Sequence, residues 1–315
     1  MNKKFNIEGK NVFISGHTGM VGKAVEKQLK KENCNILKAS REELDLTRQK
    51  DVEDWMSNFS PDVVIICAAK VGGIAANDNY PADFIYENLV IESNLINSSF
   101  KSKVSKLIFL GSSCIYPKNI TEPIKEDQLM SGLLEKTNQW YAIAKIAGIK
   151  LCQAYRKQHG SDFISIMPSN MYGPGDNYDL ETSHVLPALL RKCHEAKVKN
   201  SDFVQIWGSG NVRREFLHVN DCAKAIIFLL KYYSDFEHIN VGTGSDMTIL
   251  ELLEELKKVT NYNGKIKLDL SKPDGTQRKL LNIEKILGLG WKPSISLKKG
   301  LEDVYEDFLK NKSYL

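Results

Sequence analysis

The stretch Gly16-His-Thr-Gly19-Met-Val-Gly22 comes directly out of an apolar strand predicted over 11–16 and opens a helix predicted from about Met20 to Lys31. A chain that turns this sharply beside a phosphate needs residues without a Cβ, and the first turn of a helix offers N–H groups to an anion. Three glycines between a strand and a helix are therefore typical of a dinucleotide-binding turn. A merely tight turn is the alternative explanation.

Outward from this turn, short apolar runs alternate with helical patterns. Further strands are predicted at 35–38, 62–67, 106–111 and 163–167, and helices at 84–100 and 140–159. Continuous apolar strands separated by helices imply a parallel sheet covered on both faces. The sequence therefore predicts an α/β fold with a doubly wound, Rossmann-type parallel sheet, whose ligands bind beyond the carboxyl ends of the strands.

The pattern changes after Pro168. Residues 170–181 are rich in Gly, Pro, Asn and Asp and are predicted as a loop. Helices are predicted at 186–196, 221–233, 248–259 and 297–309, a short strand at 204–207, and a sixth strand of the main sheet at 238–242. We expect a dinucleotide-binding domain of residues 1–172 plus about 215–245, and a smaller, mostly C-terminal α/β lobe of about 173–214 plus 246–315.

The end of the second strand indicates which dinucleotide binds. It reads Lys38-Ala-Ser-Arg41 and lacks the acidic residue that would hold a ribose 2′-hydroxyl. Arg41 suits a 2′-phosphate instead, which favours NADP(H) over NAD(H), although an ordinary surface charge is the alternative. Asp45 is expected near the adenine, and Ala68-Ala69-Lys70 beneath a cofactor ribose.

Tyr141-Ala-Ile-Ala-Lys145 places a phenol and an ammonium four residues apart on one helix face. A free phenol has a pKa near roughly 10, and a neighbouring ammonium would lower it toward the range where protons move at neutral pH. Ser112, at the end of the fourth strand, can hydrogen-bond a reacting oxygen. Together with the glycine turn, these residues predict a reductase that transfers a proton through Tyr141.

Composition excludes several other classes. The net charge of +4 is spread along 315 residues, which argues against a nucleic-acid or membrane role. The N-terminus has no apolar core of a signal peptide, and no apolar run approaches the roughly 20 residues of a membrane span. Six cysteines without a C-x-x-C motif predict no metal site and a reduced, cytoplasmic protein.

Segments along nearly the whole chain resemble the GDP-L-fucose synthases, a family of extended short-chain dehydrogenases/reductases with the same G-x-x-G-x-x-G spacing. The matching segments are GHTGMVG at 16–22, AAKVGGI at 68–74, LGSSCIYP at 110–117, YAIAKIAG at 141–148, NMYGP at 170–174, SHVLPALL at 183–190, WGSG at 207–210, REFLHV at 214–219 and KPDGT at 272–276. The motifs around Cys114 and His184 discriminate best within the superfamily.

The resemblance implies conversion of GDP-4-keto-6-deoxy-D-mannose to GDP-L-fucose, by epimerisation at C3 and C5 and then reduction at C4 with NADPH. Cys114 and His184 match the family's acid/base pair, and either one can be the base. Tyr141 would protonate the oxygen at C4, supported by Ser112 and Lys145. Without the resemblance, a buried thiol and a core or cofactor-contacting histidine would be the simpler explanations of the pair.

The resemblance also assigns binding residues. The implied cofactor-binding residues are Gly16, His17, Thr18, Gly19, Met20, Val21, Gly22, Arg41, Leu110, Gly111, Ser112, Ser113, Tyr141, Lys145, Pro168, Ser169, Asn170, Met171 and His184. The implied nucleotide-sugar contacts are Lys192, Trp207, Arg214 and Asp274. Core packing is an alternative for Trp207, Arg213 competes with Arg214, and Asn170 is also placed near the diphosphate.

Two positions depart from the family, because Thr18 stands where relatives often have Arg and Lys192 lacks the forked guanidinium of an Arg. A nucleotide-sugar 4-epimerase that retains NAD would share the glycine turn and the Tyr141–Lys145 pair, but it needs no second acid/base pair such as Cys114 supplies. A non-catalytic NADPH-sensing protein is the other alternative. Because relatives commonly dimerise through helices like 84–100 and 140–159, we expect a homodimer.

Overall fold

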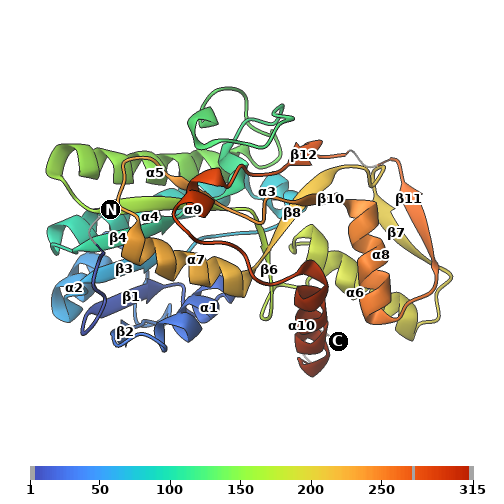
Figure 1. Ribbon diagram of the computed structural model, residues 1–315, viewed down its shortest axis with the longest axis horizontal. Coiled ribbons are helices and arrows are strands. Elements are labelled where there is room, and N and C mark those ends of the chain that lie inside the picture. The colour runs from blue at the N-terminus through green and yellow to red at the C-terminus, as the bar shows by residue number, and fades with distance from the viewer. Residues whose placement is uncertain (1–3, 272–273, 312–315) are drawn as a thin grey trace.

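In the part of the chain that this computed structural model describes, residues 4–271 and 274–311, a six-stranded parallel sheet has the strand order β2-β1-β3-β4-β5-β9 (Figure 1). The strands are β1 (Asn11–Ser15), β2 (Asn35–Leu37), β3 (Val63–Ile66), β4 (Lys106–Leu110), β5 (Phe163–Pro168) and β9 (Ile239–Val241). Their near-continuous apolar sequences fit burial on both faces. The predicted doubly wound sheet is confirmed, including the sixth strand, since β9 pairs with β5.

Helices cover both faces of this sheet (Figure 1). On one face α1 (Met20–Leu29) packs against α7 (Val219–Tyr232), and on the other α4 (Pro81–Lys101) packs against α2 (Gln49–Phe59) and α5 (Gln139–His159). Neither α2 nor the short α3 (Ile74–Asn79) is expected from the sequence pattern. The 3-10 turns η1 (Ser113–Ile115) and η2 (Glu126–Gln128) lie between β4 and α5.

The sheet reverses its order beside β1, because β2 lies on one side of β1 and β3 on the other. The loops that follow β1 and β3 therefore diverge and leave a crevice at the carboxyl ends of these strands. The glycine turn at 16–22 lies at this point, where a ligand would contact the first turn of α1.

The chain after β5 and again after β9 forms a smaller lobe, which lies to one side of the parallel sheet (Figure 1). Its strands are β6 (Asn170–Tyr172), β7 (Phe203–Trp207), β8 (Arg213–His218), β10 (Asp246–Thr248), β11 (Lys265–Asp269) and β12 (Arg278–Lys279). Its helices are α6 (Val185–Val198), α8 (Ile249–Thr260) and α10 (Leu297–Lys310), while α9 (Glu284–Gly288) lies against β9. The loop predicted over 170–181 is wrong at its start, because residues 170–172 pair with β8 as β6.

Two apolar cores correspond to these two parts. The larger surrounds the parallel sheet, and the smaller gathers side chains of α6, α8 and α10 such as Leu190, Leu253 and Phe308. Ile286 and Trp291 pack with the larger core, although the sequence grouped residues 246–315 with the lobe. The chain thus returns to the parallel sheet before it enters α10, and the exact division into domains stays a prediction.

Within the described residues, no helix is long and apolar enough to cross a membrane. All six cysteines are free thiols. Cys152, Cys193 and Cys222 are buried, whereas Cys34, Cys67 and Cys114 are partly exposed.

Candidate active site

A cavity of about 1140 Å³ opens at the carboxyl ends of β1, β3, β4 and β5 and extends to the smaller lobe. Every residue that the sequence assigned to catalysis, cofactor binding or substrate binding lines it. The larger part contributes residues 16–22, Arg41, 110–114, Tyr141, Lys145 and 168–171, and the lobe side contributes His184, Lys192, Trp207, Arg214 and Asp274. Residues 272–273 of the KPDGT motif lie outside the described residues.

The glycine turn has the geometry that a close phosphate contact requires. Gly16 has a φ of +72°, and a Cβ on it would lie 2.8 Å from the backbone of Ala68. A Cβ on Gly22 would overlap the carbonyl oxygen of Gly16. Gly19 directly precedes α1, whose first turn carries no acidic side chain. The turn therefore fits the diphosphate of a dinucleotide.

Arg41 lies exposed on the cavity wall, where its guanidinium can reach a ligand. Asp45, the nearest acidic candidate, is held in its own turn, because its Oδ1 accepts hydrogen bonds from the N–H of Thr47 at 3.0 Å and from its hydroxyl at 2.7 Å. This part of the wall thus offers a cation to a phosphate, as the sequence predicts for a 2′-phosphate.

Tyr141 and Lys145 lie one turn apart on α5, with the Lys145 Nζ 5.8 Å from the centre of the Tyr141 ring. Burial raises the pKa of Tyr141 far above its ordinary value, the charges of Cys114 and Glu92 raise it further, and a hydrogen bond with Ser112 opposes them. The predicted lowering of this pKa by Lys145 is therefore wrong in this structure. Burial dominates, so the phenol is protonated at neutral pH and can act as an acid.

Lys145 faces an acid that the sequence does not indicate. Glu92 of α4 is 2% exposed, and its Oε2 lies 3.9 Å from the Lys145 Nζ. Burial raises the pKa of Glu92 and lowers that of Lys145, while the opposite charge of each partner opposes these shifts. Glu92 is 53 residues from Lys145 in the sequence, and only the packing of α4 on α5 brings the two together.

Cys114 lies in the turn after β4, partly exposed to the cavity. Its Sγ accepts hydrogen bonds from Asn138 Nδ2 at 3.3 Å and from Lys279 Nζ at 3.5 Å. Neither partner is indicated by the sequence. An amide N–H and an ammonium therefore both point at this sulfur, at the place where it faces the cavity.

His184 stands directly before α6 on the opposite wall of the cavity. The preceding loop is fixed by Asp179, whose Oδ1 accepts from the N–H of Thr182, and by Gly73, whose N–H donates to the Thr182 carbonyl at 2.8 Å. Desolvation of the imidazole by the protein around it lowers the pKa of His184, and the charge of Lys279 lowers this pKa further. The imidazole is therefore neutral at pH 7, with one nitrogen that can accept a proton and one that can donate.

The lobe side resolves two alternatives. Arg214 lines the cavity and donates from Nη1 to the Thr276 carbonyl at 2.6 Å, whereas Arg213 is not part of the cavity wall and pairs with Asp246. Trp207 is 56% exposed and borders the cavity, so it is not core packing. Lys192 lies 5.8 Å from the centre of the Trp207 ring.

Asp274 has a partner that the sequence did not indicate. Its two carboxylate oxygens accept from the N–H of Ser209 at 2.9 Å and from the Ser209 hydroxyl at 2.8 Å. Asp274 thereby fixes the turn between β7 and β8 at the rim of the cavity. Asn170 is similarly engaged, because its Nδ2 donates to the Glu215 carbonyl at 2.9 Å.

Some cavity-lining side chains keep polar atoms that a ligand can satisfy. In the described part of the chain, Asn138, Ser169, Asp176 and Ser183 each carry a buried polar atom without a hydrogen-bond partner. Buried polar groups are normally paired, so these atoms mark a wall built for a polar ligand. Within the described residues 4–271 and 274–311, no group of His, Cys, Asp and Glu side chains could hold a metal ion.

Comparisons with known proteins agree with this geometry. The model of the NAD dependent epimerase/dehydratase family matches residues 12–242. The chain is 55% identical to a GDP-L-fucose synthase of Sinorhizobium fredii, with 97% of each chain covered. It is 50% identical to the GDP-L-fucose synthase of Escherichia coli K12, covering 95% of this chain and 97% of the relative. A GDP-L-fucose synthetase structure from Naegleria fowleri bound to NADP is similar with a TM-score of 0.91 and 26% identity, over 99% of this chain and 98% of that one.

Proposed function

The chain belongs to the NAD dependent epimerase/dehydratase family, and from this premise we propose that it is an NADP-dependent enzyme that makes GDP-L-fucose from GDP-4-keto-6-deoxy-D-mannose. The proposed reaction epimerises C3 and C5 of the sugar and then reduces the ketone at C4. One observation carries the proposal: a reductase triad, Ser112, Tyr141 and Lys145, shares a single cavity with a second pair of proton-transfer groups, Cys114 and His184.

Epimerisation needs a proton to leave one face of a carbon and another to arrive at the opposite face. The ketone at C4 acidifies the C–H bonds at both C3 and C5, because either carbanion is stabilised as an enolate. We assign removal and return of the proton to Cys114 and His184, one to each. Asn138 and Lys279 stabilise charge on the sulfur, and the neutral imidazole of His184 can give or take a proton.

Reduction follows at C4, where bound NADPH supplies the hydride. Tyr141, kept protonated by burial, gives its proton to the oxygen of C4 as the carbonyl becomes an alcohol. Ser112 hydrogen-bonds the same oxygen, and the Lys145 ammonium offsets the negative charge left on the phenolate. The phenol regains its proton from water when the product leaves, so atoms and charge balance over one turnover.

The lobe would hold the nucleotide part of the substrate. We assign the diphosphate to Arg214, and contacts with the rest of the nucleotide to Lys192, Trp207 and Asp274. Arg214 can bind phosphate with its forked guanidinium, whereas Lys192 supplies a point charge. Arg41 and residues 16–22 would hold the NADPH phosphates.

The direct test is a turnover assay with the purified chain, NADPH and GDP-4-keto-6-deoxy-D-mannose. We expect loss of NADPH absorbance in step with formation of GDP-L-fucose. Binding of NADPH without its oxidation would instead support the sensing protein, and interconversion of nucleotide sugars without net NADPH loss would support the 4-epimerase.

We also propose a homodimer formed through α4 and α5. These two helices pack side by side, and Tyr86, Trp140 and Ile143 on them are 66%, 39% and 39% exposed. Apolar side chains on neighbouring helices suit a symmetric helical interface. Sedimentation of Tyr86→Lys beside the unchanged chain tests this, because a charge at the interface should give monomers.

The cytoplasm is the proposed location. Six free thiols without a disulfide support a reducing compartment. Fractionation of cells that express the chain, with activity measured in each fraction, tests the assignment.

A further inference from the structure

Strands β8 and β12 place two pairs of cations side by side. In their parallel register Arg213 is opposite Arg278, and Arg214 is opposite Lys279. Because side chains alternate along a strand, Arg213 and Arg278 share one face while Arg214 and Lys279 share the other. The second pair lines the cavity and the first does not.

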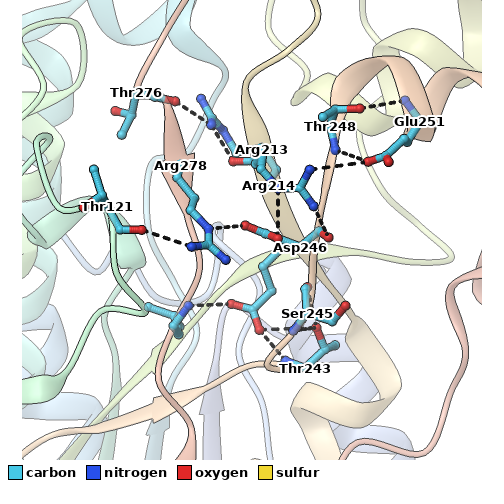
Figure 2. Close-up of polar contacts among 12 residues, drawn as sticks. Thr121, Arg213, Arg214, Thr243, Ser245, Asp246, Thr248, Glu251, Thr276 and Arg278 are labelled. Carbon is cyan, nitrogen blue, oxygen red and sulfur yellow. Dashed lines mark hydrogen bonds and ion pairs between the residues drawn. The ribbon is translucent and has the colours of Figure 1, made fainter.

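Like charges directly opposite each other weaken a strand pair. On the outer face Asp246, from the neighbouring strand β10, lies between the two guanidinium groups (Figure 2). Its Oδ1 accepts from Arg213 Nε at 3.1 Å and its Oδ2 from Arg278 Nε at 2.6 Å. The Asp246 side chain is only 6% exposed, and its buried negative charge is compensated by ion pairs with these two arginines.

Asp246 stays ionised in this position. Burial acts to raise its pKa, but the hydrogen bonds from Arg278 and Arg213 outweigh burial and hold the pKa below its ordinary value. The two arginines reach further: Arg278 Nη1 donates to the Thr121 carbonyl at 3.1 Å, and Arg213 Nη1 lies 3.8 Å from Glu251 Oε2 (Figure 2). The network thus joins β8, β10, β12 and the start of α8.

On the opposite face, the same two strands place Arg214 and Lys279 in the wall of the cavity. Lys279 Nζ lies 3.5 Å from Cys114 Sγ, and Arg214 is half-buried beside the carboxylates of Glu135 and Asp274. β12 has only two residues, so its own ladder is too short to fix where Lys279 lies. Backbone hydrogen bonds of residues 277, 280 and 282 and the bond from the Leu281 N–H to Glu215 hold the segment around β12, and the outer network adds the side-chain restraint on β12 itself.

We propose that Asp246 is a positioning residue for the active site. By clamping Arg213 and Arg278 together, it fixes the register of β8 against β12. That register brings Arg214 to the nucleotide diphosphate and Lys279 to the thiol of Cys114. The proposal rests on the proposed function, because it assigns these two cations to that substrate and to the epimerisation.

Asp246→Asn tests the clamp, since it removes the charge and sets an amide donor against a guanidinium donor. Displacement of a catalytic contact by about 1 Å can slow a reaction on the order of 100-fold. We expect exchange of solvent deuterium into C3 and C5 to slow by about that factor and the KM for the nucleotide sugar to rise. The Kd for NADPH, set by the larger part, should not change.

Asp303→Asn is the matched control, because it makes the same chemical change at a surface ion pair on α10 in the same lobe. It should leave the exchange rate, KM and Kd as they are. Asp246→Glu, which keeps the charge, should recover part of the exchange. Wild-type exchange and KM in Asp246→Asn would overturn the proposal.

If Asp246→Asn does not fold, the Arg278→Gln variant tests the same proposal instead. It removes one side of the clamp at a partly exposed position, where no buried cavity forms. We expect slowed exchange with NADPH affinity kept, and exchange at the wild-type rate would overturn the clamp.

A further readout does not need the proposed substrate. Alkylation of Cys114 by iodoacetamide, followed by peptide mass spectrometry, reports whether an ammonium lies at the sulfur, because the thiolate is the reactive form. Slower alkylation in Asp246→Asn supports the clamp even if the chain fails to use GDP-4-keto-6-deoxy-D-mannose, and an unchanged rate contradicts it. Failure of the wild-type turnover assay, in contrast, counts against the proposed function alone.

Discussion

The two sides of the cavity are built in different ways. On the cofactor side, two of the main groups of contacts come from contiguous sequence: seven residues of the glycine turn, and a phenol and an ammonium one helical turn apart. On the lobe side, Lys192, Trp207, Arg214 and Asp274 come from separate segments and meet only because short strands pair. Local spacing therefore sets the geometry of the first side, whereas strand register and polar clamps set that of the second.

This difference predicts separate effects for Tyr141, which is placed by local spacing, and for Cys114, whose sulfur contacts Lys279 of β12. Tyr141→Phe should have the largest effect, because it removes the proton donor and keeps the ring packed against Phe84. We expect the rate of NADPH oxidation to fall about 1000-fold, while deuterium exchange at C3 and C5 continues. Stopped-flow absorbance and NMR of the sugar measure the two steps separately. Equal losses in the two steps would contradict this separation.

Cys114→Ser should have the opposite selectivity. A serine hydroxyl is a much poorer base than a thiolate, so deuterium exchange should slow on the order of 100-fold. Binding of NADPH, followed by fluorescence, should keep its Kd. Exchange at the wild-type rate would remove Cys114 from the mechanism.

Arg214→Lys sharpens the comparison on the lobe side. A lysine keeps the charge but loses the fork and its hydrogen bond to the Thr276 carbonyl, so we expect KM for the nucleotide sugar to rise about 10-fold with kcat little changed. Arg191→Lys, on a surface ion pair of α6, is the control. A fall in kcat at constant KM would show that Arg214 does not hold the ground-state substrate.

The smallest effect concerns stability on the lobe side. Burial raises the pKa of Asp176 to about 7, whereas an unfolded chain gives about 3.9. The native state therefore binds the proton more tightly, and Asp176 contributes stability that is complete below pH 4 and lost as the pH rises through 7. Asp176→Asn should remove this loss, so its melting temperature should exceed that of the wild type by a few degrees more at pH 8 than at pH 5. Parallel curves from calorimetry would contradict the assigned burial cost.

Sequence reasoning was strongest where geometry is local. The glycine turn, the strands of the sheet, the Tyr141–Lys145 pair and the catalytic and binding residues assigned to the cavity were named from spacing or from the family resemblance. The predicted effect of Lys145 on the phenol was wrong, because burial of Tyr141 depends on how α4 and α5 pack.

What the sequence did not indicate is non-local. Strands β8, β10 and β12 are two to six residues long and acquire their form only by pairing with one another. Lys279 is 165 residues from the thiol that it contacts. Likewise, nothing in the sequence around Asp246 indicates that its carboxylate binds both Arg213 and Arg278, because these arginines are 33 and 32 residues away.

The most direct test of the whole account is one turnover experiment in D₂O with unlabelled NADPH and GDP-4-keto-6-deoxy-D-mannose. If one cavity epimerises and then reduces, NMR of the product should show GDP-L-fucose with deuterium at C3 and C5 and ordinary hydrogen at C4. A product without deuterium at C3 and C5, or with deuterium at C4, would contradict the account.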